Sequence, residues 1–201
     1  MTTLKWADIK TVNHMTHVDN LAGILSQGLL AHNNGFQKVD ISNRQVNQRR
    51  AVNEPVYGRP IHDYVPFYFN TRNAMLYRNQ NVFGNDVIVL GFNKNLVEKS
   101  GMVLTNGNAS CNNTRFSGKV GYLHALDWDN IFSESWCNYG VTDDELKREM
   151  MAEVLLHNHV AISELEVIYC NSQAVAKYIR ANFALGNIQL RVDTSQFFTR
   201  H

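Results

Sequence analysis

The sequence predicts an α+β fold, on two observations. Short apolar segments of strand length recur along the 201 residues, and only a few segments carry the start and stop signals of a helix. These strands and helices do not alternate regularly, as they would in a series of βαβ units. The chain holds only three prolines and no linker rich in Pro, Gly or Ser, so we expect one domain over residues 1–201.

The elements of the first half follow from apolar runs and capping residues. Asp19 or Asn20 is expected to cap a helix that ends at Gly28. Strands are expected at 14–17, 64–69, 87–92 and 102–105, and a short helix is expected to start at 74–77. Residues 31–60 are polar and form a long connection for a compact domain, which is typical of a functional loop.

The elements of the second half follow from the same signals. The spacing Thr142-Asp143-Asp144-Glu145 predicts a helix start, and Ser172 is expected to cap a helix from 173 to 183. Strands are expected at 152–156, 166–170 and 188–192. His157 and His159 would lie on one face of a strand; we interpret the pair as structural and expect no metal.

Composition and charge restrict the class of protein. The net charge is +1, although residues 38–59 carry a local +3 that either serves a phosphate-bearing ligand or forms a solvated helix face. No apolar run approaches the about 20 residues that cross a bilayer. The three cysteines are widely spaced and fit neither a disulfide framework nor a zinc site. We therefore expect a cytoplasmic protein in a reducing compartment.

The usual sequence signatures of catalysis are missing. The chain has no Gly-x-Gly-x-x-Gly, no Walker Gly-x-x-x-x-Gly-Lys, no His-Glu-x-x-His and no Gly-x-Ser-x-Gly. An aromatic-rich segment, 62–77, remains; it is either a buried strand or a surface on which flat heterocycles stack. Glu153 also stands out, because it interrupts an apolar segment. A buried carboxylate is costly, so Glu153 is either salt-bridged at a strand end or a catalytic acid in a cleft.

Six motifs, taken in order from about residue 13 to 170, carry a resemblance to a known family. They are His14-x-Thr16-His17-x-Asp19-Asn20-Leu21, Arg49-Arg50, Asp63-Tyr64-Val65-Pro66-Phe67-Tyr68-Phe69 followed by Met75-Leu76-Tyr77, Thr114-Arg115-Phe116, Asp127-Trp128 and Ala152-Glu153. Together they resemble the DarT family, bacterial toxins that ADP-ribosylate DNA. The aromatic string with the following Met-Leu-Tyr is the most specific of the six.

The resemblance implies an ADP-ribosyltransferase-like fold, with two antiparallel sheets around a central NAD+ cleft and peripheral helices. Glu153 and Arg50 would carry catalysis. The residues implied to bind the NAD+ substrate are His14, Thr16, Asn20, Arg50, Tyr68 and Met75. Residues 33–50 would form a lid over NAD+, and residues 127–149 would read the acceptor. The candidate DNA contacts are Arg49, Thr114, Arg115, Trp136, Lys147 and Arg148.

The same resemblance implies a partner and an acceptor. The acceptor would be a base of single-stranded DNA, thymidine first and guanosine second, and a macrodomain antitoxin would remove the modification. RNA or protein as acceptor, and an inactive nucleic-acid-binding module, remain as alternatives. Met151 replaces a polar residue of the family pattern, which leaves open how the base is held. We expect a monomer with no metal and no membrane contact.

Overall fold

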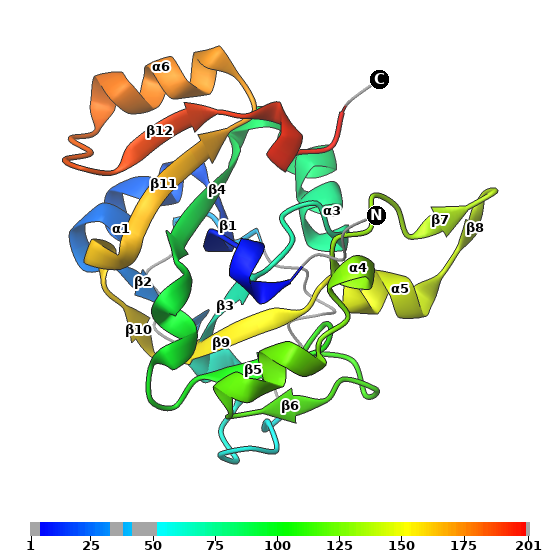
Figure 1. Ribbon diagram of the computed structural model, residues 1–201. Helices are drawn as coiled ribbons and strands as arrows, with labels where there is room; N and C mark the ends of the chain where they lie inside the picture. Colours follow the sequence, from blue (N-terminus) through cyan, green and yellow to red (C-terminus); the bar gives the residue numbers. More distant parts are fainter. Residues whose placement is uncertain (1–4, 33–37, 42–51, 200–201) are drawn as a thin grey trace.

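A computed structural model of the chain describes residues 5–32, 38–41 and 52–199. Its main feature is an eight-stranded sheet in the order β12-β11-β4-β1-β3-β9-β5-β6 (Figure 1). These strands are β1 (Thr11–His17), β3 (Tyr64–Tyr68), β4 (Val87–Asn93), β5 (Val103–Thr105), β6 (Phe116–Ser117), β9 (Glu153–His157), β11 (Leu165–Cys170) and β12 (Gln189–Val192). All neighbours are antiparallel except β11 and β12. The parallel pair is joined through α6, a single βαβ unit in an otherwise antiparallel sheet.

The sheet is almost divided at its centre. β1 pairs with β4 along seven residues, but β1 and β3 pair only at Asn13 and Tyr68. Beyond that contact the two strands diverge. Four strands therefore lie on each side of a split, which agrees with the expected α+β architecture of two sheets around a cleft, except that the halves stay joined at one residue pair and one half contains the parallel pair β11–β12.

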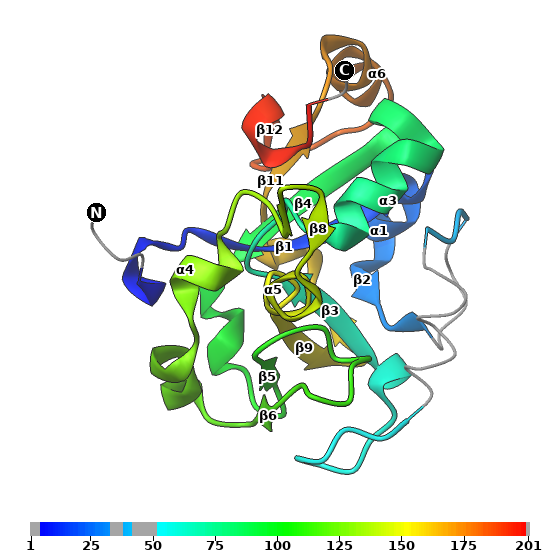
Figure 2. The same ribbon diagram turned by 90° about the vertical axis from the view of Figure 1, so that its right-hand side faces the viewer.

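The helices and the short strands surround this sheet. They are α1 (Leu21–Gln27), β2 (Leu29–Leu30), α3 (Ala74–Phe83), α4 (Trp128–Ile131), β7 (Cys137–Asn138), β8 (Val141–Thr142), α5 (Asp144–Glu149), β10 (His159–Val160) and α6 (Gln173–Asn182). In Figure 2, where β1 runs across the view, α1, β2 and α3 lie toward one end of this strand and α4 toward the other. The β7–β8 hairpin projects from the body of the molecule (Figure 1).

Side chains that alternate along the strands point to opposite faces of the sheet and form two apolar clusters. Val12, Phe67 and Phe92 belong to the larger apolar cluster, whereas Met15 and Tyr68 belong to a smaller one that includes Met151 and Phe197. The run 87–92 is apolar throughout because β4 is buried on both faces. Among the described helices, none is long and apolar enough to cross a membrane.

The helix ends confirm two of the four capping predictions and correct the other two. Ser172 caps α6 by accepting from the Val175 N–H, and α1 ends at Gly28, whose φ of 77° favours glycine. The side chain of Asn20 makes no capping bond, so that prediction was wrong. Asp143, not Thr142, caps α5 by accepting from the Leu146 N–H at 2.9 Å.

The pair of histidines after β9 was also misplaced by the sequence argument. Asn158 has a φ of 71°, which turns the chain between the two imidazoles. His157 therefore ends β9 while His159 begins β10, where its Nε2 contacts the carbonyl oxygen of Gln27 at 2.9 Å. The two side chains do not share one strand face.

Candidate active site

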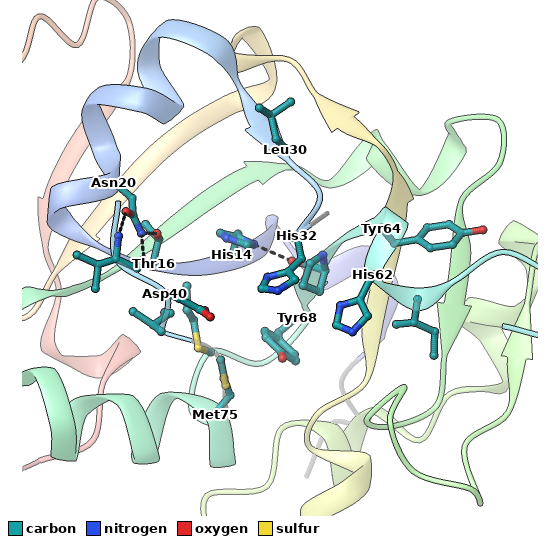
Figure 3. A pocket seen from close by; sticks show the side chains of 15 residues that line it. His14, Thr16, Asn20, Leu30, His32, Asp40, His62, Tyr64, Tyr68 and Met75 are labelled. Atoms are coloured by element: carbon teal, nitrogen blue, oxygen red, sulfur yellow. Dashed lines mark hydrogen bonds between the residues drawn. The ribbon is translucent and has the colours of Figure 1, made fainter. Parts of the chain in front are cut away.

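A pocket lies where β1 and β3 separate (Figure 3). Its free volume, about 100 Å³, is of the order of the ~150 Å³ cavities that accept a benzene-sized ring. A second hollow of about 50 Å³ shares His14, Thr16, Asn20 and Leu30 with it and extends towards α1. The predicted NAD+ residues that line the pocket are His14, Thr16, Asn20, Tyr68 and Met75.

His14 is fixed across the split between β1 and β3. Its Nδ1 lies 2.9 Å from the carbonyl oxygen of Pro66, and its ring meets the edge of Phe67 at 6.0 Å between centroids. A carbonyl oxygen can only accept, so Nδ1 carries the proton. In the neutral imidazole Nε2 is then an acceptor, and the ring is oriented by the strand opposite.

Asn20 joins the end of β1 to residues 38–41, the described part of the predicted lid. Its Nδ2 donates to Thr16 Oγ1 at 3.1 Å and to the Val39 carbonyl at 2.8 Å, while its Oδ1 accepts from the Val39 N–H at 2.8 Å. The amide is thus engaged in holding residue 39 against β1. Val39, Asp40 and Ile41 all line the pocket. The described part of the predicted lid therefore lies over the predicted NAD+ site.

Tyr68 and Met75 form another wall of the pocket (Figure 3). Tyr68 is the last residue of β3, and Met75 lies in the first turn of α3, which Asn73 caps by accepting from the N–H groups of Met75 and Leu76. Alternate residues of β3 line the pocket, whereas Phe67 between them packs into the core.

Glu153 lies directly beside this wall. It is the first residue of β9 and pairs with Tyr68, so the carboxyl group and the phenol project to the same face of the sheet. The residue is fully buried, and its Oε1 accepts the backbone N–H of Ala109 at 2.9 Å. Its own N–H donates to Thr105 Oγ1 at 2.9 Å. The acid is therefore interior and adjacent to the pocket, not at an exposed strand end.

The predicted DNA contacts divide into interior and exposed residues. Arg148 is buried; it pairs with Glu145 at 2.6 Å and with Glu149 at 3.3 Å, and it donates to the Asn106 carbonyl at 3.1 Å. Thr114 is buried too, and its hydroxyl donates to the Asn108 carbonyl at 2.6 Å. The structure thus gives Arg148 and Thr114 internal partners, and a DNA contact by either residue stays a prediction.

The other predicted DNA contacts are more accessible. Arg115 is exposed, and Lys147 and Trp136 are half-buried. Both Arg49 and Arg50 lie outside the described residues, as do residues 33–37 and 42–51 of the lid region.

The pocket also contains residues that the sequence argument missed. The rings of His32 and His62 lie side by side, with centroids 5.1 Å apart (Figure 3). His62 opens the aromatic segment, but His32 carries no local sequence signal and comes to the pocket only through β2. Among the described residues no group of three or more His, Cys, Asp or Glu side chains could hold a metal ion.

Comparison with known proteins identifies the family. The family described as "ssDNA thymidine ADP-ribosyltransferase, DarT" matches residues 13–198. The chain belongs to the DarT family. The predicted resemblance and the ADP-ribosyltransferase-like α+β fold are therefore confirmed, and DarT proteins are DNA ADP-ribosyltransferases.

Two DarT relatives are informative. A DNA ADP-ribosyl transferase of Thermus sp. strain 2.9 is 32% identical over 84% of both chains. The solved structure of Thermus sp. 2.9 DarT in complex with ADP-ribosylated ssDNA matches with a TM-score of 0.85 and 25% identity, over 98% of this chain and 100% of its own. The structure of the same protein in complex with NAD+ matches with a TM-score of 0.77 and 27% identity, over 95% of this chain and 98% of its own. A DNA ADP-ribosyl transferase–glycohydrolase fusion protein of Thermosipho africanus is 25% identical over 92% of this chain and 48% of its own length.

Proposed function

We propose that this protein transfers ADP-ribose from NAD+ to a base of single-stranded DNA and releases nicotinamide. The observation that carries the proposal is the fully buried carboxyl group of Glu153, which pairs across the sheet with Tyr68 of the pocket wall. Membership of the DarT family supports the same chemistry, as do the Thermus relative's complexes with NAD+ and with ADP-ribosylated ssDNA.

The pocket suits the nicotinamide end of NAD+. Tyr68 and Met75 offer an aromatic face and a polarizable thioether to a flat ring. On the opposite side, His14 and Thr16 offer polar groups to the ribose and the amide, with Asn20 behind them. Because Asn20 is already bonded to Thr16 and to residue 39, we assign it to shaping the pocket and positioning the lid.

Glu153 supplies the charge that the reaction needs. When the bond between nicotinamide and ribose breaks, its electron pair leaves with nicotinamide, and positive charge develops on the ribose carbon. A fixed carboxylate in a water-excluded site stabilises that charge better than water does. The base nitrogen then forms a bond to the same carbon, and the proton that it loses passes to Glu153.

Arg50 completes the proposed catalytic set as the cation that holds the diphosphate of NAD+ or aligns the target base. A guanidinium suits this task because its donors form a rigid fork. Arg49, its neighbour, is assigned to the DNA strand, together with Arg115, Trp136 and Lys147.

We infer that the acceptor is thymidine, in agreement with the description of the family. Chemistry on a base requires the base to be out of the duplex, which favours single-stranded DNA. Guanosine is the second choice. The family resemblance and the Thermosipho fusion to a DNA ADP-ribosyl glycohydrolase support a toxin restrained by a macrodomain antitoxin that removes the modification. Both would act on DNA in the cytoplasm.

The test uses labelled NAD+ with single-stranded DNA, duplex DNA, RNA and bulk protein as separate acceptors. Unmodified protein, Glu153→Ala and a control variant of an exposed acid, Glu98→Ala, are compared. We expect label on single-stranded DNA with the unmodified protein and with Glu98→Ala, and none with Glu153→Ala. Label on RNA or protein alone would move the acceptor to that class. No consumption of NAD+ in any mixture would leave only a nucleic-acid-binding function.

A further inference from the structure

Three aromatic side chains from distant parts of the chain form a cluster beside α3. Tyr77 lies on α3, Trp136 precedes β7, and Phe198 lies in the C-terminal segment; we call these three residues the aromatic cluster. The centroids are 5.8 Å apart for Tyr77 and Trp136, 5.4 Å for Tyr77 and Phe198, and 5.7 Å for Trp136 and Phe198, all edge to face. Half of the Tyr77 side chain remains exposed, so the cluster faces solvent.

Arg72 completes this surface with a positive charge. Its guanidinium carbon lies 5.3 Å from the centroid of the Phe198 ring. Its Nε is buried and has no hydrogen-bond partner, and among the described residues Arg72 forms no ion pair. Arg148, by contrast, has two carboxylates. A half-buried guanidinium that has no acidic partner among the described residues can offer its terminal N–H groups to an external anion.

Hydrogen bonds to the backbone hold the segments that carry this surface. The backbone N–H of Arg72 donates to Asn70 Oδ1 at 2.9 Å, and Asn70 Nδ2 donates to the Ile131 carbonyl at 2.7 Å. Phe198 is held on α3 by two bonds to the side chain of Gln80, at 2.9 and 3.2 Å. The backbones that carry the cation and the Phe198 ring are therefore held in place, which lowers the entropy cost of binding.

The surface is continuous with the candidate active site. Arg72 follows Tyr68 by four residues, and Tyr68 pairs with Glu153. Phe198 and Met75 pack against the same small apolar cluster, which contains Tyr68 and Met151. If a polymer places one of its units in the pocket, the neighbouring unit would lie on this surface.

Charge restricts where a nucleic-acid strand can cross this surface. Residues 127–149, the segment predicted to read the acceptor, contain seven acidic and two basic residues, a net charge of −5. This segment repels phosphates, so a nucleic-acid strand that crosses it needs a cation at its edge. Arg72 stands at that edge, because its ring partner Phe198 contacts Trp136 of the same segment.

We propose that Arg72 and the aromatic cluster form a nucleotide subsite for single-stranded DNA, next to the position of the target base. Arg72 pairs with a phosphate, and the exposed faces of Tyr77 and Trp136 stack on a neighbouring base. The inference rests on the proposed function, since that function supplies the polymer.

The experiment measures binding of a fluorescein-labelled, thymidine-containing single-stranded oligonucleotide at several salt concentrations. The Glu153→Ala background prevents modification during the measurement. Arg72→Gln is compared with Arg180→Gln, and Tyr77→Leu with Tyr178→Leu. Both controls lie on α6, where Arg180 is exposed and Tyr178 is about as exposed as Tyr77.

Arg72→Gln should weaken binding about tenfold at low salt and lower the slope of log affinity against log salt by about 0.7, the value for one lost phosphate contact on a single strand. Tyr77→Leu should weaken binding by about fivefold or more with no change in slope. The controls should match the parent. Arg72→Lys should restore the slope, and Tyr77→Phe the affinity.

Affinities of Arg72→Gln and Tyr77→Leu equal to those of their controls would overturn the subsite. The Tm of each variant is measured alongside. If Arg72→Gln or Tyr77→Leu does not fold, the affinity and salt slope of Arg72→Lys or Tyr77→Phe are compared with those of the parent instead. The proposed function fails separately, if the protein with Glu153 intact does not label single-stranded DNA with NAD+. Weaker binding without labelling would keep the subsite and reject the reaction.

Discussion

The backbone N–H of Ala109 donates a 2.9 Å hydrogen bond to Oε1 of Glu153, from a loop 44 residues earlier in the chain. This bond fixes one oxygen of a buried carboxyl group. The loop is fixed in turn, since Thr105 Oγ1 bonds to the Gly107 carbonyl at 2.7 Å and the Asn108 N–H donates to the Arg148 carbonyl at 3.0 Å. The orientation of the proposed catalytic acid thus depends on residues that need not touch a substrate.

Glu153→Gln isolates the charge of this carboxyl group from its shape. The amide oxygen of glutamine can still accept from the Ala109 N–H, so we expect a folded protein whose Tm is unchanged or higher. ADP-ribose transfer should fall by about 100-fold or more, the scale for loss of one major electrostatic contribution. Single-turnover assays with labelled NAD+ and circular dichroism measure the two effects. Transfer at the rate of the unmodified protein would remove Glu153 from the mechanism.

Thr105→Val tests whether positioning of Glu153 matters. Valine has the shape of threonine but leaves the Glu153 N–H and the Gly107 carbonyl without a partner, a cost of about 1–3 kcal/mol for each buried group. We expect a lower Tm and a lower kcat with little change in KM for NAD+. Thr105→Ser keeps the hydroxyl and should restore both. If serine and valine behave alike, the hydroxyl does not position the acid.

Arg148→Met separates the internal role of Arg148 from a DNA contact. Methionine keeps the length of the side chain but loses the bonds to Asn106 and the ion pairs; in the pair with Glu145 the carboxylate is largely solvent-exposed, so that pair contributes little. We expect a loss of about 2 kcal/mol, which for a chain of this size lowers Tm by roughly 4–8 °C. Lys177→Met, an exposed change on α6, should leave Tm unaltered. An unchanged Tm with weaker, less salt-dependent DNA binding would restore Arg148 to the DNA surface.

Local sequence signals predicted most elements and part of the pocket. The apolar run at 87–92 and the Ser172 cap are encoded by adjacent residues, and both were found as predicted. The residues at 14, 16, 68 and 75 were assigned to one site by resemblance, and all four line the pocket. Their roles in binding NAD+ stay predictions, as do the single domain and the monomer.

Long-range contacts account for what the sequence did not predict. Asn20 is a residue type that often caps helices, but its side-chain amide bonds to the backbone of Val39, 19 residues away. Arg148 has the charge of a DNA contact, but it is buried and donates to the carbonyl of Asn106, 42 residues away in the sequence. β1 and β3 pair at a single residue pair, and the point at which two strands stop pairing cannot be predicted from the local sequence of either strand.

Glu54, in a turn that contacts Tyr64 of the pocket, is expected to make the stability of the protein depend on pH. The carboxylate of Glu54 is almost fully buried; it accepts N–H bonds from Val56, Tyr57 and Arg59 at 2.6, 3.0 and 3.1 Å, and the hydroxyl of Tyr64 at 2.9 Å. Burial alone raises the pKa of Glu54, but these donors outweigh it and hold the pKa below its usual 4.5. Burial and the nearby carboxylate raise the pKa of Tyr64.

Because the pKa of Glu54 is lower in the folded state, the unfolded chain takes up the proton first as pH falls. The stabilisation is fully present above about pH 4.5 and is lost below it, as pH approaches the folded pKa. Glu54→Gln places an amide donor among N–H donors, so it should lower the urea midpoint at pH 7, and the difference from the unmodified protein should shrink below pH 4.5. Glu98→Gln, at an exposed acid, should track the unmodified protein. A difference that stays constant between pH 7 and pH 3 would show that the Glu54 charge does not stabilise the turn.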